Sequence, residues 1–234
     1  MLDIIYEDAS LLVVNKPAGL VCHPTKGGEL SSLISRVRLY LGGEGRLVNR
    51  LDRETSGVTL AAKNSAAAGE LGKLWERRGV EKVYLAIVHG AVRDDSGAVD
   101  LALGKDEKSR IAIKDCVRPD GAAARTEFFV ERRFRRGGRD FSLLRLRPRT
   151  GRKHQIRVQA AHAGLPLIGD RTYNPAWRAQ DPSHPLLDFP RQALHAEVLS
   201  LEHPEQPGVR MSWTAELPKD LRQLETALRL GRSL

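Results

Sequence analysis

Short apolar segments, separated by turns rich in Gly, Pro and Asp, run through most of this chain. Segments such as Leu11–Val14 and Val83–Val88 are too short for helices and are rich in residues that favour strands. Some neighbouring segments are joined by a tight turn, as at Gly137 and Gly138, which is typical of β-hairpins. Because hairpins produce antiparallel pairs, the pattern predicts an α+β fold with a largely antiparallel, mixed sheet flanked by helices and loops.

The remaining segments support this fold class. Further strands are predicted at Ile4–Tyr6, Val58–Ala62, Thr126–Val130, Phe141–Leu146, Ala193–Leu201 and Val209–Thr214. Helical spacing of apolar residues predicts helices at Ser31–Leu41, Ala66–Arg77, Lys153–Ala163 and Leu221–Leu230. Turn residues predict further hairpins within 93–125 and an irregular surface loop at 174–190. No linker interrupts the 234 residues, so we expect a single domain, 1–234.

Several classes of protein are excluded by the sequence. No apolar run is long enough to span a bilayer, and the acidic N-terminus does not resemble a secretory signal. Cys22 and Cys116 have no CxxC partner, so we expect neither a disulfide framework nor a zinc knuckle. The histidines are scattered and no dinucleotide, P-loop or nucleophile-elbow motif occurs, so we expect no metal and no cofactor. A cytoplasmic protein without membrane contact fits these observations.

The positive charge of the chain is concentrated in one segment. Arg132–Arg157 holds eleven bases and one acid, Asp140, for a net charge of +10, against +9 for the whole chain. Such a segment favours a polyanionic partner, most simply nucleic acid. The alternative is a basic face that is merely solvated, and charge alone does not separate the two.

Asp52 lies between Arg50 and Arg53, in a turn-like stretch before a predicted strand. Neighbouring cations favour the charged carboxylate, so Asp52 is expected to be ionised at neutral pH and could act as a nucleophile or a base. The Thr-Ser-Gly sequence that follows can form a tight turn that fixes its position. The alternative is a turn aspartate that only satisfies backbone N–H groups.

Tyr84 occupies a predicted strand in which Val83, Leu85 and Ile87 share the opposite face. Its ring could stack on a nucleobase, and its hydroxyl could transfer a proton. The alternative is a tyrosine that only packs within the sheet, since tyrosine is a good strand former.

A third segment, Arg147–Arg157, combines a turn at Thr150 with the predicted start of a helix near Lys153. In that helix Lys153 and Arg157 form an i,i+4 pair of like charges, which is unfavourable unless an anion lies alongside. The helix N-terminus adds its own partial positive charge. An RNA phosphate or the Asp52 carboxylate would satisfy both features; the alternative is a solvated basic helix end.

In this order, the three segments resemble the RluA-like family of pseudouridine synthases. The resemblance extends over nearly the whole chain, and its most specific parts are Arg50–Gly57 and Thr150–Arg157. The other matching segments are Tyr6–Leu20, Lys82–Ala86, Gly164–Asp170 and Leu194–Ala196. The resemblance implies a pseudouridine synthase catalytic fold, an isomerase activity without a cofactor, and an RNA partner that is either rRNA or tRNA.

The resemblance also implies roles for single residues. Asp52 corresponds to the catalytic aspartate, and Tyr84 to the tyrosine that stacks on the target uracil and takes part in proton transfer. Arg157 corresponds to the basic residue that pairs with Asp52, and Arg50 to an arginine that helps to displace the target nucleotide. The remaining basic and polar residues of these motifs are expected to contact RNA: Arg53, Arg149, Arg152, Lys153, His154 and Gln155.

Two positions depart from the family pattern. The family usually has His where this sequence has Asn49 and Gln159, and neither position carries an assigned chemical role. The family often carries an S4-like RNA-binding domain. This chain starts almost directly on the catalytic domain, so RNA is expected to be bound by that domain itself or by loops such as 93–125 and 174–190.

The expected function is therefore isomerisation of a specific uridine in rRNA or tRNA to pseudouridine, by an aspartate-dependent mechanism in a monomer. One alternative is a non-catalytic RNA-binding or assembly protein of the same fold, and the presence of both Asp52 and Tyr84 argues against it. Another is a metal-dependent nuclease. It would need a second acidic cluster, and Glu54 is the one acid near Asp52 in the sequence.

Overall fold

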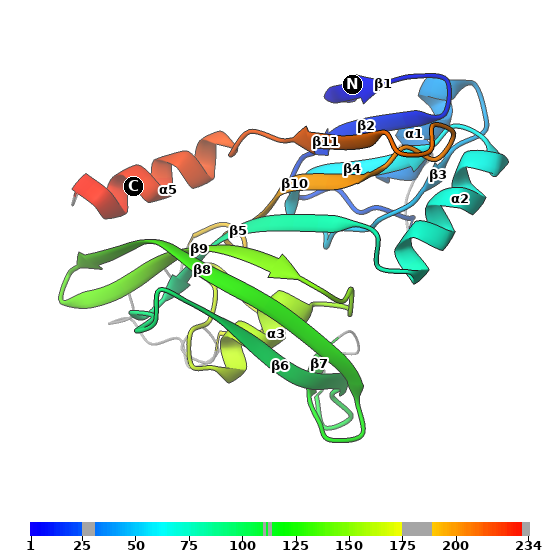
Figure 1. The fold of residues 1–234 in the computed structure, drawn as a ribbon. Helices are drawn as coiled ribbons and strands as arrows, with labels where there is room; N and C mark the ends of the chain where they lie inside the picture. The colour runs from blue at the N-terminus through cyan, green and yellow to red at the C-terminus, as the bar shows by residue number, and fades with distance from the viewer. Residues whose placement is uncertain (25–30, 110, 112–113, 175–188, 231–234) are drawn as a thin grey trace. The chain divides into compact units, whose positions relative to one another are not determined.

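The computed structural model describes residues 1–24, 31–109, 111, 114–174 and 189–230 (Figure 1). The chain divides into two compact units. The first comprises Met1–Val83 and His195–Leu217, and the second Tyr84–Leu194 and Pro218–Leu234. The expected single domain over 1–234 stays a prediction.

The first unit is built on a sheet of short strands. Their bounds are β1 (Ile4–Glu7), β2 (Leu11–Lys16), β3 (Arg46–Leu47), β4 (Ser56–Ala62), β10 (Leu194–Glu202) and β11 (Arg210–Thr214). The order is β1-β2-β4-β10, with β3 paired to β4 and β11 paired to β10. These pairs are antiparallel except β4 and β10, which run parallel where His195 lies opposite Ser56.

Two helices, α1 (Leu33–Leu41) and α2 (Ser65–Glu76), belong to this unit. Ser32 caps α1 at its start, and Gly42 ends it in the left-handed conformation that glycine adopts readily. The Asn64 side chain caps α2 by accepting a hydrogen bond of 2.8 Å from Ala67 N.

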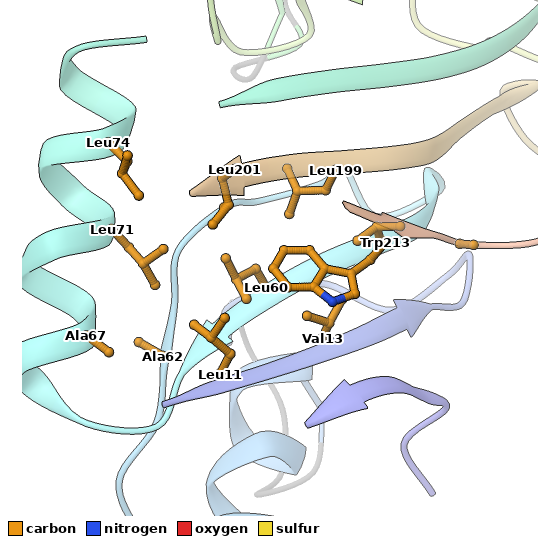
Figure 2. Close-up of a cluster of buried hydrophobic side chains, with 12 residues drawn as sticks. Leu11, Val13, Leu60, Ala62, Ala67, Leu71, Leu74, Leu199, Leu201 and Trp213 are labelled. Carbon is orange, nitrogen blue, oxygen red and sulfur yellow. The ribbon is translucent and has the colours of Figure 1, made fainter. Parts of the chain in front are cut away.

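Apolar side chains of α2 pack against the sheet to form the core of the first unit. Ala67, Leu71 and Leu74 are spaced four and three residues apart, so they share one face of the helix. Figure 2 shows these side chains beside Leu60 of β4 and Trp213 of β11. Full burial of a leucine contributes about 1.5–3 kcal/mol, so this cluster is a main source of stability for the unit.

The second unit contains an antiparallel sheet. Its strands are β5 (Glu81–His89), whose first three residues belong to the first unit, β6 (Ser96–Lys105), β7 (Asp115–Val117), β8 (Ala122–Arg136) and β9 (Arg139–Pro148). The order is β5-β9-β8-β6-β7, and every neighbouring pair is antiparallel. Gly137 and Gly138 join β8 to β9 with positive φ at both positions, as a tight hairpin turn requires.

Helices α3 (Gln155–His162) and α5 (Lys219–Leu230) complete the described part of the second unit. Ile156 of α3 belongs to an apolar cluster with Ala86 and Leu144 of the sheet. The buried face of α5 carries Leu221, Leu224, Ala227 and Leu228. This is the amphipathic C-terminal helix that the leucine spacing predicts.

The mixed, mostly antiparallel sheet confirms the predicted fold class. The predicted hairpins within 93–125 correspond to β6, β7 and the start of β8. The predicted loop at 174–190 lies largely outside the described residues. Within the described ranges, no helix is both long and apolar enough to cross a membrane.

Candidate active site

Asp52 lies in a turn that is held in place through its backbone. Thr55 N donates to Asp52 O at 3.1 Å and closes the turn directly before β4. The fully buried Lys16 donates from Nζ to Arg53 O at 3.1 Å, and to Pro17 O and Leu20 O at 2.9 and 2.8 Å. One buried ammonium group therefore ties the chain after β2 to the turn that carries Asp52.

Cys22 holds the residue that directly precedes Asp52. Leu51 N donates to the Cys22 sulfur at 3.3 Å, and the sulfur lies 3.4 Å from Leu51 O. Burial raises the pKa of the Cys22 thiol, which disfavours the reactive thiolate. Cys22 is therefore part of the support for the turn.

The Ser56-Gly57 end of this turn meets the start of β10. The fully buried His195 lies 2.9 Å from Ser56 Oγ through Nδ1 and 3.1 Å from Ala215 O through Nε2. Because a carbonyl only accepts, Nε2 carries the proton that it donates to Ala215 O. A Cβ on Gly57 would lie 2.1 Å from Ala196 O, so only glycine permits this approach of the strands. Two segments that carry the family resemblance, Arg50–Gly57 and Leu194–Ala196, are thus packed against each other.

Tyr84 lies in β5, opposite Leu146 of β9. It is half-buried, and it packs against the apolar cluster that includes Ala86 and Leu144. The apolar cluster therefore covers part of the Tyr84 ring, and the rest of the ring is exposed. The predicted stacking on uracil stays a prediction.

Arg157 is buried in α3 and forms a bidentate ion pair with Asp170. Its Nε donates to Oδ2 at 2.7 Å, and its Nη2 donates to Oδ1 at 2.9 Å. Its guanidinium carbon also lies 5.0 Å from the centroid of the Tyr173 ring. Sequence reasoning did not assign Asp170 or Tyr173 a role. The thirteen-residue separation from Arg157 carries no periodic signal for Asp170, although its segment forms part of the family resemblance.

The predicted helix start near Lys153 is wrong. Helix α3 begins at Gln155, and the preceding His154 has a φ of 53° in the left-handed region. The Gln155 side chain accepts a hydrogen bond from Arg152 N at 3.0 Å, which forms a tight turn before the helix. Lys153 and Arg157 therefore do not share a helix face. Lys153 instead pairs with Asp115 at 2.8 Å.

The predicted RNA-contacting residues differ in exposure. Gln155 is buried, and its Nε2 donates to Arg125 O and Thr126 Oγ1 at 3.0 and 2.9 Å. His154 is half-buried and lies 2.8 Å from Tyr173 OH through Nδ1. The remaining five are exposed: Arg50, Arg53, Arg149, Arg152 and Lys153. Contact of these residues with RNA stays a prediction.

The two departures from the family pattern have structural roles in this chain. Asn49 Oδ1 accepts from Leu60 N at 2.7 Å, so its side chain supports β4. The buried Gln159 accepts from Thr126 Oγ1 at 2.6 Å and donates to Ala124 O at 2.8 Å. Gln159 therefore ties α3 to β8.

The basic segment is balanced by acids that are distant in sequence. At least seven of its eleven bases lie within 4.0 Å of a carboxylate, and six of the partners come from outside the segment. Examples are Arg132 with Glu225 at 3.1 Å and Arg149 with Glu127 at 2.7 Å. The net charge of the segment in the sequence therefore overstates its positive field in the folded chain.

Asp52 belongs to the first unit, and Tyr84 and Arg157 belong to the second. The predicted pairing of Arg157 with Asp52 joins residues of the two units and stays a prediction.

Comparisons with known proteins agree on one family. The sequence model described as RNA pseudouridylate synthase matches residues 10–162, a range that includes Asp52, Tyr84 and Arg157. The uncharacterized RNA pseudouridine synthase YlyB of Bacillus subtilis (strain 168) is 38% identical over 236 residues, which covers 97% of this chain and 73% of that protein. Ribosomal large subunit pseudouridine synthase D of Pseudomonas aeruginosa is 36% identical over 243 residues, which covers 99% of this chain and 73% of that protein.

A solved structure extends the agreement to the fold. Human RNA Pseudouridylate Synthase Domain Containing 1 superposes with a TM-score of 0.72 at 27% identity, and the match covers 100% of this chain and 97% of the human one. The family model spans more than half of this chain, and both bacterial relatives exceed 30% identity. The chain therefore belongs to the RluA-like family of RNA pseudouridine synthases, which are isomerases that convert uridine in RNA to pseudouridine.

Proposed function

We propose that the chain isomerises a specific uridine in RNA of the large ribosomal subunit, with Asp52 as its catalytic carboxylate. The observation that supports this role is the Asp52 turn, whose backbone is held by Lys16 and Cys22 while the Asp52 side chain is only half-buried. A carboxylate on a fixed backbone can approach a reacting atom with little loss of conformational entropy.

The reaction rearranges bonds without net oxidation or reduction. The N1–C1′ bond of uridine breaks, a C5–C1′ bond forms, the C5 proton leaves and N1 gains a proton. Asp52 acts at the ribose C1′ or at the uracil C6. Neither a metal nor a cofactor is needed to balance these steps. The target base leaves its helix or loop to reach the carboxylate, so base flipping is part of the reaction.

The family resemblance also implies roles for Tyr84 and Arg157 in the proposed reaction. Tyr84 stacks on the flipped uracil with the part of its ring that the sheet leaves exposed, and takes part in proton transfer. The family resemblance implies that Arg157 is the cation that pairs with the catalytic carboxylate, and the Arg157 guanidinium is bound by Asp170. Arg50 helps to displace the target nucleotide. The RNA backbone is contacted by exposed basic side chains, those of Arg53, Arg149, Arg152 and Lys153.

The choice of substrate rests on the relatives. Several of the most similar proteins bear the name ribosomal large subunit pseudouridine synthase D, and these match this chain over 95% or more of its length. This favours ribosomal RNA over transfer RNA as the substrate. We expect the enzyme to act as a monomer in the cytoplasm.

The test is to map pseudouridine by mass spectrometry in all ribosomal and transfer RNA from a strain that lacks the gene. The expected result is a missing pseudouridine in large-subunit RNA, restored by the wild-type gene and not by an Asp52→Asn variant. A missing pseudouridine in transfer RNA alone would overturn the substrate assignment. Restoration by Asp52→Asn would overturn the role of Asp52.

A further inference from the structure

The guanidinium of Arg157 is fixed by two groups that constrain different motions. Asp170 accepts from both Nε and Nη2 of Arg157, so it fixes rotation of the guanidinium within its own plane. The Tyr173 ring lies 5.0 Å from the guanidinium carbon and restricts movement out of that plane. Together the two contacts determine a single orientation for a buried cation.

Asp170 is itself held rigidly. Its Oδ1 also accepts from Thr172 N at 3.0 Å and Tyr173 N at 3.1 Å, so the carboxylate caps its own turn. Gly169 has a φ of 70°, and a Cβ there would lie 2.1 Å from Arg191 O. The backbone around Asp170 is therefore packed too tightly to shift without wider rearrangement.

Tyr173 is fixed at its hydroxyl as well as at its ring. The hydroxyl accepts from Asp115 N at 3.0 Å and lies 2.8 Å from His154 Nδ1. Burial raises the pKa of Tyr173 to about 12, so the phenol keeps its proton at neutral pH. The proton is therefore available for donation to His154, and the ring stands in one position beside Arg157.

Stability alone is a weak explanation for this arrangement. A buried ion pair is often no more stabilising than well-packed apolar residues of similar volume. A planar, bidentate arginine does provide a defined direction for its remaining N–H groups.

We propose that Asp170 and Tyr173 are positioning residues that set the direction of the Arg157 guanidinium for the reaction assigned to Asp52. This inference rests on the proposed function, in which Arg157 holds the catalytic carboxylate. Neither residue touches the reacting atoms; both act through Arg157.

A double-mutant cycle tests this dependence. Single-turnover rates are measured for the full-length chain and its Asp170→Asn, Arg157→Lys and combined variants, on the RNA identified by the deletion strain. We expect Asp170→Asn to lower the rate roughly 10- to 100-fold with unchanged RNA affinity, because misorientation of a site residue has effects of this size. The combined variant should be no slower than Arg157→Lys alone. Rate losses that multiply, or an unchanged rate in Asp170→Asn, would overturn the proposal.

Tyr173 variants cover the case in which Asp170→Asn does not fold. Tyr173→Phe keeps the ring and removes the hydroxyl, whereas Tyr173→Leu removes the ring. We expect Tyr173→Phe to lose stability but keep its rate within about threefold, and Tyr173→Leu to lose about tenfold in rate. Equal rates for the two variants would exclude positioning by the ring.

A measurement without RNA separates this inference from the proposed function. In nitrogen-15 NMR spectra of the wild-type chain, the buried Arg157 Nε–H should exchange slowly with water, and Asp170→Asn or Tyr173→Leu should speed this exchange. Unchanged exchange in both variants would overturn the positioning role. If exchange behaves as expected but the wild type forms no pseudouridine, the proposed function fails and the orientation of Arg157 stands.

Discussion

In the first unit, Asp52 is held through its backbone, by Lys16, Cys22 and the turn bond from Thr55, and its side chain is half-buried. In the second unit, Arg157 is held through its side chain, by two hydrogen bonds to Asp170, and the whole residue is buried. The two candidate site residues are thus fixed by different kinds of contact.

The difference follows from what each side chain must do. A carboxylate that meets a substrate must stay accessible, so its position has to come from the backbone beneath it. A buried cation has to be compensated where it lies, so its partner also determines its direction. Substitution of the Asp52 side chain should therefore leave the free energy of unfolding unchanged, whereas substitution of the groups that hold the turn or the ion pair should lower it.

The largest expected effects on stability come from substitution of two glycines, one in each unit, at which two backbone segments of the same unit approach closely. Gly57→Ala and Gly169→Ala each place a Cβ 2.1 Å from a carbonyl oxygen at positive φ. We expect each to lower the free energy of unfolding by more than about 3 kcal/mol, measured by urea denaturation. Gly69→Ala in α2 is the control, since its Cβ meets nothing within 4 Å and helix propensity favours alanine by up to about 1 kcal/mol. A loss below about 1 kcal/mol at Gly57 or Gly169 would contradict the packing of that region.

Lys16→Met tests whether the Asp52 turn depends on the buried ammonium. The change leaves the carbonyl groups of Pro17, Leu20 and Arg53 without this donor. We expect a loss of about 2–4 kcal/mol in the free energy of unfolding, together with a lower isomerisation rate. Lys73→Met is the matched control, because Lys73 forms an exposed pair with Glu70 and should lose less than about 0.5 kcal/mol. Equal losses in the two variants would mean that Lys16 is not a main support of the turn.

A second arginine–aspartate pair in the second unit, Arg191 with Asp220, should make the stability of the fold depend on pH. Burial is the largest single effect and raises the pKa of Asp220. The hydrogen bonds and charge of Arg191, together with backbone N–H donors such as that of Leu221, lower the pKa by more in total, so the net pKa lies below its ordinary value. The folded chain therefore binds the proton less tightly than the unfolded chain, and the pair stabilises the fold above the unfolded pKa of about 4. This stability is lost as pH falls through the lowered pKa.

The measurement compares the wild type with Asp220→Asn across pH. We expect the wild type to be more stable by about 1 kcal/mol at pH 7, with the difference shrinking below about pH 4. A difference that grows as pH falls would contradict the sign of the shift.

The smallest expected effects belong to two arginines of the β8–β9 hairpin that remain at least partly exposed. Arg145 pairs with Glu131, and Arg132 pairs with Glu225, in partly exposed positions. Arg145→Gln and Arg132→Gln should each change the free energy of unfolding by less than about 0.5 kcal/mol in thermal or urea denaturation. A loss of more than about 2 kcal/mol in the free energy of unfolding at either position would contradict the expectation that these pairs stabilise the fold less than the buried Arg157–Asp170 pair.

Local patterns predicted most of the elements but not all of their bounds. The helix Leu33–Leu41 follows from its apolar spacing and from the Gly42 that ends it. Strand β8 extends from Ala122 to Arg136, well beyond the predicted Thr126–Val130, because the exposed Arg132, Arg133 and Arg135 break the apolar alternation. The start of α3 was missed because the left-handed His154 depends on contacts made by neighbouring side chains.

The site was predicted less completely than the fold. Motif resemblance predicts roles for Asp52 and Arg157, but it does not assign the groups that hold them. Asp170 lies thirteen residues from Arg157 along the chain and reaches it through a turn. A count of charges along the sequence also cannot identify the acids that pair with the basic segment. Strand pairing and helix packing bring these acids close to its arginines. Such contacts depend on the tertiary fold, which spacing alone does not encode.

We propose that this chain isomerises uridine through Asp52. The most direct measurement is tritium release from ribosomal RNA labelled at C5 of uridine, because formation of the C5–C1′ bond expels that hydrogen. The purified wild type should release tritium in proportion to the pseudouridine formed. Asp52→Asn should release none above background, while it keeps the unfolding transition of the wild type. Release by Asp52→Asn at the wild-type rate, with pseudouridine formed, would show that the reaction does not need the Asp52 carboxylate.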